Sequence, residues 1–335
     1  MRIVCTGAGG FIGSHLVEKL IGEGHEVHCI LRYNSTGNIG NLIYIKDITQ
    51  KAKLHFCDLR DTDHFRNIVK GVGSVDIIYH LAASNSVPYS FDATDFVMEN
   101  NIKSTMSVLK VCNEFKIPRC IVMSTSEVYG TCYEMIKETN HYYAQSVYAA
   151  SKIAMEKLVE AYSGYANNET QFTVVRGFNT YGDRQSLRAI VPWIMYQAIK
   201  GNEITLGGEN SARDLIHVYD MVKALYLVGN SHNSSVFFTY NIGSGVTLKI
   251  AEIMELMGES TEKGLKVKYQ GALHRNCKFK DVEYLNADNS LFFNMFDFKA
   301  DVGIKMGLLL LKNFIVSNLD RYDVEYDLIM NHGWK

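Results

Sequence analysis

Tyr148 and Lys152 are the two residues of this sequence whose types and spacing most directly suggest chemistry. Residues four apart share one face of a helix, so both side chains can point into the same site. A free phenol has a pKa of about 10 and is a poor base at neutral pH, but a nearby ammonium favours the phenolate. Tyr148 can then take a hydroxyl proton while a hydride leaves the same carbon. The pair therefore predicts oxidation of an alcohol.

A strand end rich in hydroxyl groups precedes this pair by about twenty residues. Residues 120–124 form an apolar run that continues into Ser124-Thr-Ser-Glu-Val-Tyr-Gly130. The Tyr-x-x-x-Lys spacing alone is common on exposed helices. Together with Thr125, Ser126 and Glu127 after a strand, and with the glycine-rich turn described next, it predicts a catalytic site.

Three glycines at the start of the chain, Gly7, Gly10 and Gly13, are spaced three residues apart. They lie between an apolar strand, residues 3–5, and an amphipathic stretch, residues 14–21. The first lets the chain turn sharply, the second lets the backbone approach a pyrophosphate, and the third lets the helix pack on the strand. The free N–H groups and the dipole of that helix then face the phosphates. The segment predicts dinucleotide binding.

Strand-like and helical stretches alternate through the first half of the chain. Alternation of this kind indicates a parallel sheet covered by helices on both faces. The strands are expected at residues 27–31, 54–56, 77–80, 120–124 and 172–176, and the helices at 14–21, 63–70, 102–115 and 148–162.

After residue 176 the alternation of strands and helices ends. Loops rich in Gly, Asn and Arg follow, with short helices such as residues 190–200. We therefore expect an α/β fold: a Rossmann-type doubly wound parallel sheet with a smaller, mixed α/β substrate-binding lobe. Residues 1–178 and about 214–250 are assigned to the dinucleotide-binding domain. Residues 179–213 and about 251–335 are assigned to the substrate lobe.

The composition excludes several other classes of protein. The 335 residues are 47% hydrophobic and 21% charged with a net charge of −2, so no nucleic-acid-binding footprint is visible. The apolar run at 306–311 is too short to span a bilayer, so no membrane association is expected. The sequence starts directly in a strand without a basic n-region or cleavage site, so no secretory signal is expected, and the seven cysteines lack a Cys-x-x-Cys spacing. We expect a cytoplasmic protein with reduced thiols and no metal site.

Several short motifs, in order along the first 220 residues, resemble those of extended short-chain dehydrogenases/reductases that modify nucleotide sugars. A further motif, Asn286-Ala-Asp-Asn-Ser290, extends the likeness. The matching segments are Thr6-Gly-Ala-Gly-Gly-Phe-Ile-Gly13, Asp58-Leu-Arg-Asp61, His80-Leu-Ala-Ala83, Ser124-Thr-Ser-Glu-Val-Tyr-Gly130, Tyr148-Ala-Ala-Ser-Lys152, Phe178-Asn-Thr-Tyr-Gly182 and Arg213-Asp214.

The resemblance implies roles for individual residues. Asp58 matches the aspartate that accepts from the adenine amino group, although a helix N-cap is an alternative. Asn179 and Arg213 match positions that hold the substrate diphosphate, and Arg188 and Arg275 are further substrate candidates. His274-Arg-Asn-Cys-Lys lacks the usual Arg-Pro pair of the family. The implied cofactor-binding residues are Gly7, Gly10, Phe11, Ile12, Gly13, Arg32, Asn34, Ser35, Asp58, Leu59, Leu81, Ala82, Ala83, Tyr148 and Lys152.

Glu127 separates the reactions within this family. Epimerases of the UDP-galactose type carry small residues at this position, whereas hexose 4,6-dehydratases carry Thr-Asp-Glu or Thr-Ser-Glu. After oxidation at C4 the adjacent ketone acidifies the C5 proton, which a carboxylate can remove while the C6 hydroxyl leaves. Hydride returned to C6 then gives a 4-keto-6-deoxy sugar. The catalytic set implied is Thr125, Ser126, Glu127, Tyr148 and Lys152, with a solvated surface position as the alternative for Glu127.

Residues 178–192 resemble the 4,6-dehydratases that act on nucleotide-linked N-acetylglucosamine in nonulosonic-acid pathways. Asp183 and Leu187 replace the proline and alanine usual there. The expected substrate is UDP- or GDP-N-acetylglucosamine. The alternatives are a dehydratase that forms a 5,6-ene, a UDP-glucuronate decarboxylase, an NDP-sugar epimerase and a non-catalytic dinucleotide sensor. The joint presence of Thr125, Glu127, Tyr148 and Lys152 argues against the sensor.

Arg32 directs the choice of cofactor. NAD-selective members end the second strand in a carboxylate, but residues 27–35 contain none and Arg32 follows the strand. A guanidinium suits a 2′-phosphate, so NADP is preferred, with NAD as the alternative. The helical stretches 102–115 and 148–162 carry more apolar surface than one sheet face needs. The resemblance implies that they build a homodimer.

Overall fold

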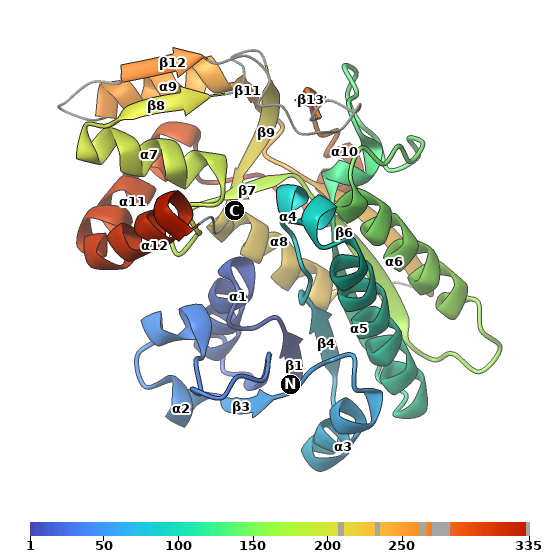
Figure 1. Cartoon of the computed structure of the whole chain (residues 1–335). Helices are drawn as coiled ribbons and strands as arrows, with labels where there is room; N and C mark the ends of the chain where they lie inside the picture. The colour runs from blue at the N-terminus through green and yellow to red at the C-terminus, as the bar shows by residue number, and fades with distance from the viewer. Residues whose placement is uncertain (207–210, 232–234, 261–265, 270–281, 333–335) are drawn as a thin grey trace. The chain divides into compact units, whose positions relative to one another are not determined.

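The computed structural model of the chain (Figure 1) describes residues 1–206, 211–231, 235–260, 266–269 and 282–332. The chain divides into two compact units. Unit 1 comprises Met1–Val128, Ser146–Gly177 and Val222–Ile242, and unit 2 comprises Tyr129–Gln145, Phe178–Met221 and Gly243–Lys335.

Unit 1 is built on a seven-stranded sheet in which every neighbouring pair is parallel. The strand order is β10-β6-β5-β4-β1-β2-β3, so the direction of winding changes between β1 and β4. Ligands of open α/β sheets bind at the carboxyl ends of the strands beside such a point. The strands are β1 (Arg2–Thr6), β2 (Glu26–Leu31), β3 (Lys53–Phe56), β4 (Ile77–His80), β5 (Arg119–Thr125), β6 (Gln171–Gly177) and β10 (Phe237–Ile242).

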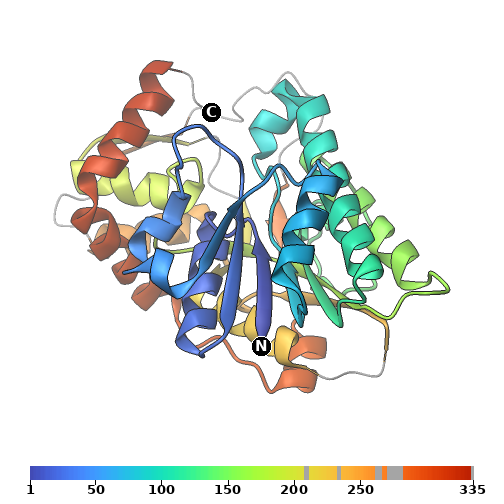
Figure 2. The ribbon, with the colours of Figure 1, turned by 90° about the horizontal axis from the view of Figure 1, so that it is seen from below.

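Helices cover both faces of this sheet, and its inner strands are accordingly nearly continuous runs of buried residues. Helices α3 (Thr62–Val72), α5 (Thr94–Glu114) and α6 (Val147–Ser163) lie together on one face (Figures 1 and 2), where Phe65, Val108 and Met155 pack against the strands. On the other face Tyr79 of β4 donates a 3.4 Å hydrogen bond to the carbonyl of Leu225 in α8 (Val218–Asn230).

Shorter elements complete unit 1. Helix α1 joins β1 to β2, and a right-handed crossover places it on the face opposite α3. The remaining bounds are α1 (Phe11–Gly22), η1 (Gly40–Tyr44), α2 (Ile48–Lys51), α4 (Val87–Asp92) and η2 (Ser126–Tyr129), the last of which ends at the boundary with unit 2.

Unit 2 contains a four-stranded sheet and a two-stranded sheet. In the larger one β9 (Ala212–His217) pairs with β7 (Asn179–Tyr181), β11 (Thr247–Lys249) and β13 (Tyr284–Leu285). The smaller one joins β8 (Glu203–Leu206) to β12 (Lys266–Tyr269). The helices that lie wholly in unit 2 are, among the described residues, α7 (Ile190–Lys200), α9 (Ile250–Ser260), α10 (Ser290–Phe296), α11 (Ile304–Ser317) and α12 (Leu319–His332).

The predicted fold class is confirmed: unit 1 has the doubly wound parallel sheet, and unit 2 has a smaller mixed architecture. The compact units divide the chain differently from the predicted domains. Residues 214–221 and 243–250 lie in unit 2, because β9 pairs with three strands of that unit. The loop 129–145 also lies in unit 2, where Ile136 bridges Ala287. The assignment of each unit to a ligand stays a prediction.

Within the described ranges, none of the helices combines the length and the apolar character that crossing a membrane requires.

Candidate active site

The end of β5 and the start of α6 bring the predicted catalytic residues together within unit 1. Thr125 is the last residue of β5, and its hydroxyl accepts a 3.2 Å hydrogen bond from the backbone N–H of Glu127. Ser146 caps α6 by accepting from the N–H of Ala149, which fixes the turn that carries Tyr148. The side chains of Tyr148 and Thr125 are hydrogen-bonded.

The environment of Tyr148 favours the neutral phenol. The residue is buried, and burial is the main cause that raises its pKa above the usual value of a tyrosine; the charge of Glu127 raises it further, while the Thr125 hydrogen bond opposes both. The expectation that the nearby ammonium of Lys152 favours the phenolate is not met in this structure, because burial raises the pKa of the phenol. The influence of Glu127 on the phenol means that its carboxylate lies within electrostatic reach of Tyr148.

Lys152 is anchored to the sheet. Its Nζ donates a 2.8 Å hydrogen bond to the backbone carbonyl of Met123 in β5. Burial lowers its pKa to about 8, with the charge of Glu156 acting in the opposite direction. The ammonium thus lies beneath the strand end that carries Thr125, where the low polarity of the interior strengthens its interactions.

A buried ion pair lies behind this site, and neither of its residues was predicted from the sequence. Arg176, next to the end of β6, binds both carboxylate oxygens of Glu156 on α6, with Nη2 to Oε2 at 2.7 Å. Ser124 also donates to Glu156. Two features of the sequence could have indicated this pair. Glu156 follows Lys152 by four residues and so lies on the same helix face, and an arginine near the end of an otherwise apolar strand needs a partner.

The glycine-rich turn forms a cradle in which side chains do not fit. Gly7 has φ +67°, and a Cβ there would lie 2.7 Å from the backbone nitrogen of Ala82. A Cβ on Gly13 would lie 2.2 Å from the carbonyl oxygen of Gly7. Gly10 precedes α1, whose first turn holds Phe11 and Ile12 and has no acidic residue. This arrangement fits a pyrophosphate at the helix N-terminus, because the free N–H groups there favour anions.

The loop after β4 lies against this turn. The backbone N–H of Leu81 donates to the carbonyl of Thr6 at 3.3 Å, and the N–H of Ala82 donates to the hydroxyl of Thr6 at 3.3 Å. Ala83 follows in the same loop. The predicted cofactor residues of the first and fourth strands are thereby brought together at neighbouring carboxyl ends of the sheet.

The predicted adenosine end carries two arginines, of which only Arg32 was predicted from the sequence. Arg32 is exposed beyond β2, with its guanidinium 5.4 Å from the centroid of the Phe96 ring, and Arg60 lies 5.9 Å from the same ring. Arg60 also binds Asp58, with Nη2 to Oδ2 at 2.6 Å. Asp58 is therefore paired in this structure, and Arg60 and Phe96 join the candidate residues. No local pattern singles them out, since Phe96 lies 36 residues after Arg60 on another element.

The remaining predicted residues of this end have distinct positions. Asn34 orders the loop after β2, donating to the carbonyls of Arg32 and Asn38 at 3.2 and 2.9 Å. Ser35 is exposed in that loop, and Leu59 is buried. Asp58, Arg60, Asp61, Glu99 and Lys103 line a groove of about 460 Å³.

Two of the predicted substrate residues lie on neighbouring strands of unit 2. Asn179 begins β7 and pairs in register with Leu215 of β9, two residues after Arg213. Arg213 donates to the backbone carbonyls of Ala212, at 3.0 Å, and of Val282. Arg188 is exposed before α7. Arg275 lies outside the described residues.

Comparison with known proteins places this geometry in a family. The family model described as "GDP-mannose 4,6 dehydratase" matches residues 4–309, which include the glycine turn, the β5 end and α6. The chain belongs to this family. Its sequence is 30% identical over 317 residues to GDP-mannose 4,6 dehydratase of Cricetulus griseus, covering 85% of this chain and 83% of the relative. It is 26% identical over 353 residues to dTDP-D-glucose 4,6-dehydratase of Dictyostelium discoideum, covering 100% of this chain and 77% of the relative.

Solved structures of family relatives share the fold. The structure described as the NAD-dependent NDP-hexosamine 5,6-dehydratase TunA, involved in tunicamycin biosynthesis, is 25% identical, with a TM-score of 0.80 over 94% of this chain and 98% of that chain. Other similar structures are 4-epimerases in complex with NAD. Further sequence relatives are named as UDP-glucose 4-epimerase and UDP-glucuronic acid decarboxylase. The extended short-chain dehydrogenase/reductase family is thus shown, whereas several reactions occur among its members.

Proposed function

We propose that this protein is a nucleotide-sugar 4,6-dehydratase. The observation that carries the proposal is the position of Glu127 two residues after Thr125, with its charge acting on the phenol of Tyr148. A carboxylate so close to the group that removes the hydroxyl proton is suited to act on the neighbouring carbon of the same sugar. An epimerase has no step that requires this carboxylate.

The chemistry assigned to each residue follows from its surroundings. Bound NAD(P) supplies the hydride acceptor for the first step and the donor for the last. Tyr148 Oη takes the proton of the C4 hydroxyl, and Thr125 orients that phenol through their hydrogen bond. Tyr148 acts from its phenolate form, which becomes the neutral phenol on taking this proton, and the positive charge of Lys152, anchored on the Met123 carbonyl, stabilises that phenolate.

Glu127 performs the elimination in this proposal. Its carboxylate removes the C5 proton, which the C4 ketone has acidified, and the electron pair of the C5–H bond forms the C5–C6 double bond. The C6 hydroxyl leaves with the proton that Glu127 returns, so that one water is lost. Hydride added to C6 and a proton added to C5 then give the 4-keto-6-deoxy sugar, and the cofactor returns to its oxidised form.

We propose UDP- or GDP-N-acetylglucosamine as the substrate. The support is the likeness of residues 178–192 to dehydratases that act on this sugar, together with the neighbouring strand positions of Asn179 and Arg213, whose side-chain types suit a diphosphate. A panel of nucleotide sugars, read by mass spectrometry and proton NMR, tests the proposal. Loss of one water with a new C6 methyl signal is the expected result.

A dehydratase that forms a 5,6-ene is the second candidate, because TunA is among the similar structures. That reaction keeps the elimination but returns hydride to C4, so its product has an alkene signal and no C6 methyl signal. In the same assay, loss of carbon dioxide would identify a decarboxylase, and an isomer of unchanged mass would identify an epimerase. Either of these outcomes would overturn the proposed dehydration.

We further propose NADP as the preferred cofactor. Arg32 and Arg60 both lie against the Phe96 ring at the predicted adenosine end, and the end of β2 carries no carboxylate to repel a 2′-phosphate. The relatives described with NAD make NAD the alternative.

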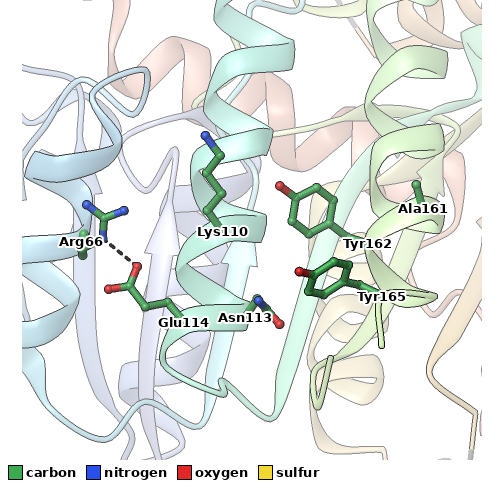
Figure 3. Close-up of a pocket in the computed structure, with 7 residues that line it drawn as sticks. All are labelled: Arg66, Lys110, Asn113, Glu114, Ala161, Tyr162 and Tyr165. Atoms are coloured by element: carbon green, nitrogen blue, oxygen red, sulfur yellow. Dashed lines mark hydrogen bonds and ion pairs between the residues drawn. The ribbon is translucent and has the colours of Figure 1, made fainter. Parts of the chain in front are cut away.

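We also propose a homodimer formed through α5 and α6. Seven residues of α3, α5, the end of α6 and the turn after it line a groove of about 540 Å³ (Figure 3). Tyr162 and Tyr165 extend toward Lys110 and Asn113 of α5, and Arg66 on the far side is paired with Glu114. A second copy is the occupant that the family resemblance implies. Light scattering at micromolar concentration tests this, and a monomeric mass would contradict it.

A further inference from the structure

A buried chain of hydrogen bonds connects the dinucleotide turn to the catalytic helix, with His80 at its centre. His80 is the last residue of β4 and is 1% exposed. Its Nδ1 lies 2.9 Å from the hydroxyl of Thr6, the residue before Gly7, and its Nε2 lies 3.1 Å from the hydroxyl of Thr105 on α5. No role was predicted for this imidazole from the sequence motifs.

The proton positions in this chain follow from its two ends. The Thr105 hydroxyl lies 2.7 Å from the backbone carbonyl of Asn101, which can only accept, so Thr105 must donate there. Thr105 can then only accept from His80, and the proton of the imidazole must be on Nε2. The N–H of Ala82 can only donate, and it reaches the Thr6 hydroxyl at 3.3 Å. Thr6 in turn donates to Nδ1 of His80.

A neutral imidazole satisfies every member of the chain. A second proton on His80 would leave the hydroxyl hydrogen of Thr6 without its acceptor. Burial and the positive charge of Lys152 lower the pKa of His80 to about 3, in agreement with the neutral form. Among the described residues, the hydrogen bonds of this network are therefore all donated in one direction. They run from Ala82 through Thr6, His80 and Thr105 to Asn101.

Asn101 extends the connection to the catalytic tyrosine. Its side-chain Nδ2 donates to the hydroxyl of Ser151 at 2.9 Å, and Ser151 donates to the carbonyl of Tyr148 at 2.7 Å. The side chain of Asn101 also pairs with both backbone groups of Ser84, in the loop after β4, at 2.7 and 3.1 Å. The loop that borders the glycine turn and the first turn of α6 are thus fixed to the same residue.

We propose that His80, as the neutral imidazole protonated at Nε2, is a positioning residue that holds the predicted cofactor loop, residues 81–84, in register with Tyr148. The inference rests on the proposed function for the catalytic role of Tyr148. The hydrogen-bond network around His80 does not depend on that function. A fully satisfied buried network specifies one geometry, because any other tautomer or rotamer leaves a polar group without a partner. His80 acts through Thr6, Thr105 and Asn101 and touches neither ligand in this proposal.

The state of the imidazole can be measured on the unmodified protein. In protein labelled with ¹⁵N at histidine, two-bond ¹H–¹⁵N correlations distinguish the two neutral tautomers from the cation. His80 is assigned by its through-space contacts to the methyl groups of Thr6 and Thr105. The expected result is a neutral Nε2–H tautomer that does not titrate between pH 5 and pH 8, because even pH 5 lies about two units above the His80 pKa of about 3. A proton on Nδ1, or titration near neutral pH, would overturn the proposal.

Three variants test the positioning role. Thr105→Val keeps the shape of the side chain but removes the hydroxyl that accepts from His80, whereas Thr105→Ser keeps the hydroxyl. Thr170→Val is the matched control, because Thr170 is equally buried in unit 1 and its hydroxyl has no partner among the described residues. Thr105→Val should weaken cofactor binding and lower kcat, each by about tenfold, the effect of one lost buried hydrogen bond.

Thr105→Ser should restore both quantities to within about threefold of the wild type, and Thr170→Val should leave them unchanged. Equal cofactor affinity and kcat in the Val and Ser variants would overturn the proposal. Should Thr105→Val fail to fold, the NMR measurement on the wild type still decides it. Absence of turnover with every nucleotide sugar would instead overturn the proposed function, and the tautomer and the cofactor affinity would still report on His80.

Discussion

Glu156 and Arg176 form an ion pair inside unit 1, with Nη2 to Oε2 at 2.7 Å and side chains only 3% and 4% exposed. Removing one partner of such a pair leaves an uncompensated buried charge. Glu156→Ala should therefore destabilise the protein by about 3–5 kcal/mol in urea denaturation. The double variant Glu156→Ala/Arg176→Met should lose less than the sum of the two single variants, because it leaves no unpaired charge.

Glu160→Gln is the matched control on the same helix, since Glu160 and Lys157 form an exposed pair at 2.7 Å. Its expected effect is at most about 0.5 kcal/mol. Equal losses of stability in Glu156→Ala and Glu160→Gln would show that burial does not set the strength of the inner pair.

Tyr148→Phe should abolish turnover, with a loss of kcat of at least about 10²-fold, while cofactor binding stays close to that of the wild type. The substitution keeps the buried ring and removes only the oxygen that takes the proton. Steady-state rates and calorimetric titration with the cofactor provide the two measurements. Near wild-type turnover would remove Tyr148 from the proposed mechanism.

Arg32→Ala and Arg60→Ala address the choice of cofactor. Each should weaken NADP far more than NAD, by about tenfold or more, because only NADP carries the phosphate with which a guanidinium pairs. Dissociation constants for both cofactors, measured on each variant, give the ratio. If the wild type prefers NAD and neither substitution changes the ratio, the NADP preference is wrong.

Glu127→Gln separates oxidation from elimination. The variant should still oxidise C4, since Thr125, Tyr148 and Lys152 remain, but an amide cannot take the C5 proton. With substrate deuterated at C5, the wild type should exchange the label with solvent and lose one water. The variant should accumulate reduced cofactor, seen by its near-ultraviolet absorbance, and retain the label. Full dehydratase activity in this variant would contradict the role of Glu127.

Lys152 should make stability depend on pH in the alkaline range. Burial lowers its pKa from 10.5 to about 8. Between these values the unfolded chain binds a proton that the folded chain does not, so stability rises with pH through this window. Relative to Lys152→Met, the wild type should therefore gain stability from pH 8 to pH 10. A difference between the two proteins that stays constant with pH would contradict the shift.

Local patterns were sufficient for the fold class, although the edge strand β10 was not predicted. The five inner strands of the parallel sheet are short, mostly buried runs, and each covering helix has an apolar face, so both can be predicted from the sequence. The glycine turn could also be predicted from the sequence, because a positive φ at Gly7 and the close approach at Gly13 require the absence of a side chain. The four-residue spacing put Tyr148 and Lys152 on one helix face without further information.

The tertiary structure decided which groups these residues meet. Glu156 with Arg176, Arg60 with Phe96, and His80 with Thr6 and Thr105 join elements far apart in the chain. The pKa of Tyr148 was predicted in the wrong direction for the same reason. The spacing to Lys152 is a local property, whereas burial and the nearby Glu127 charge arise only when β5 and α6 pack together. Helical and strand periodicity specifies which face of an element is buried, but the partner it meets there is specified by packing.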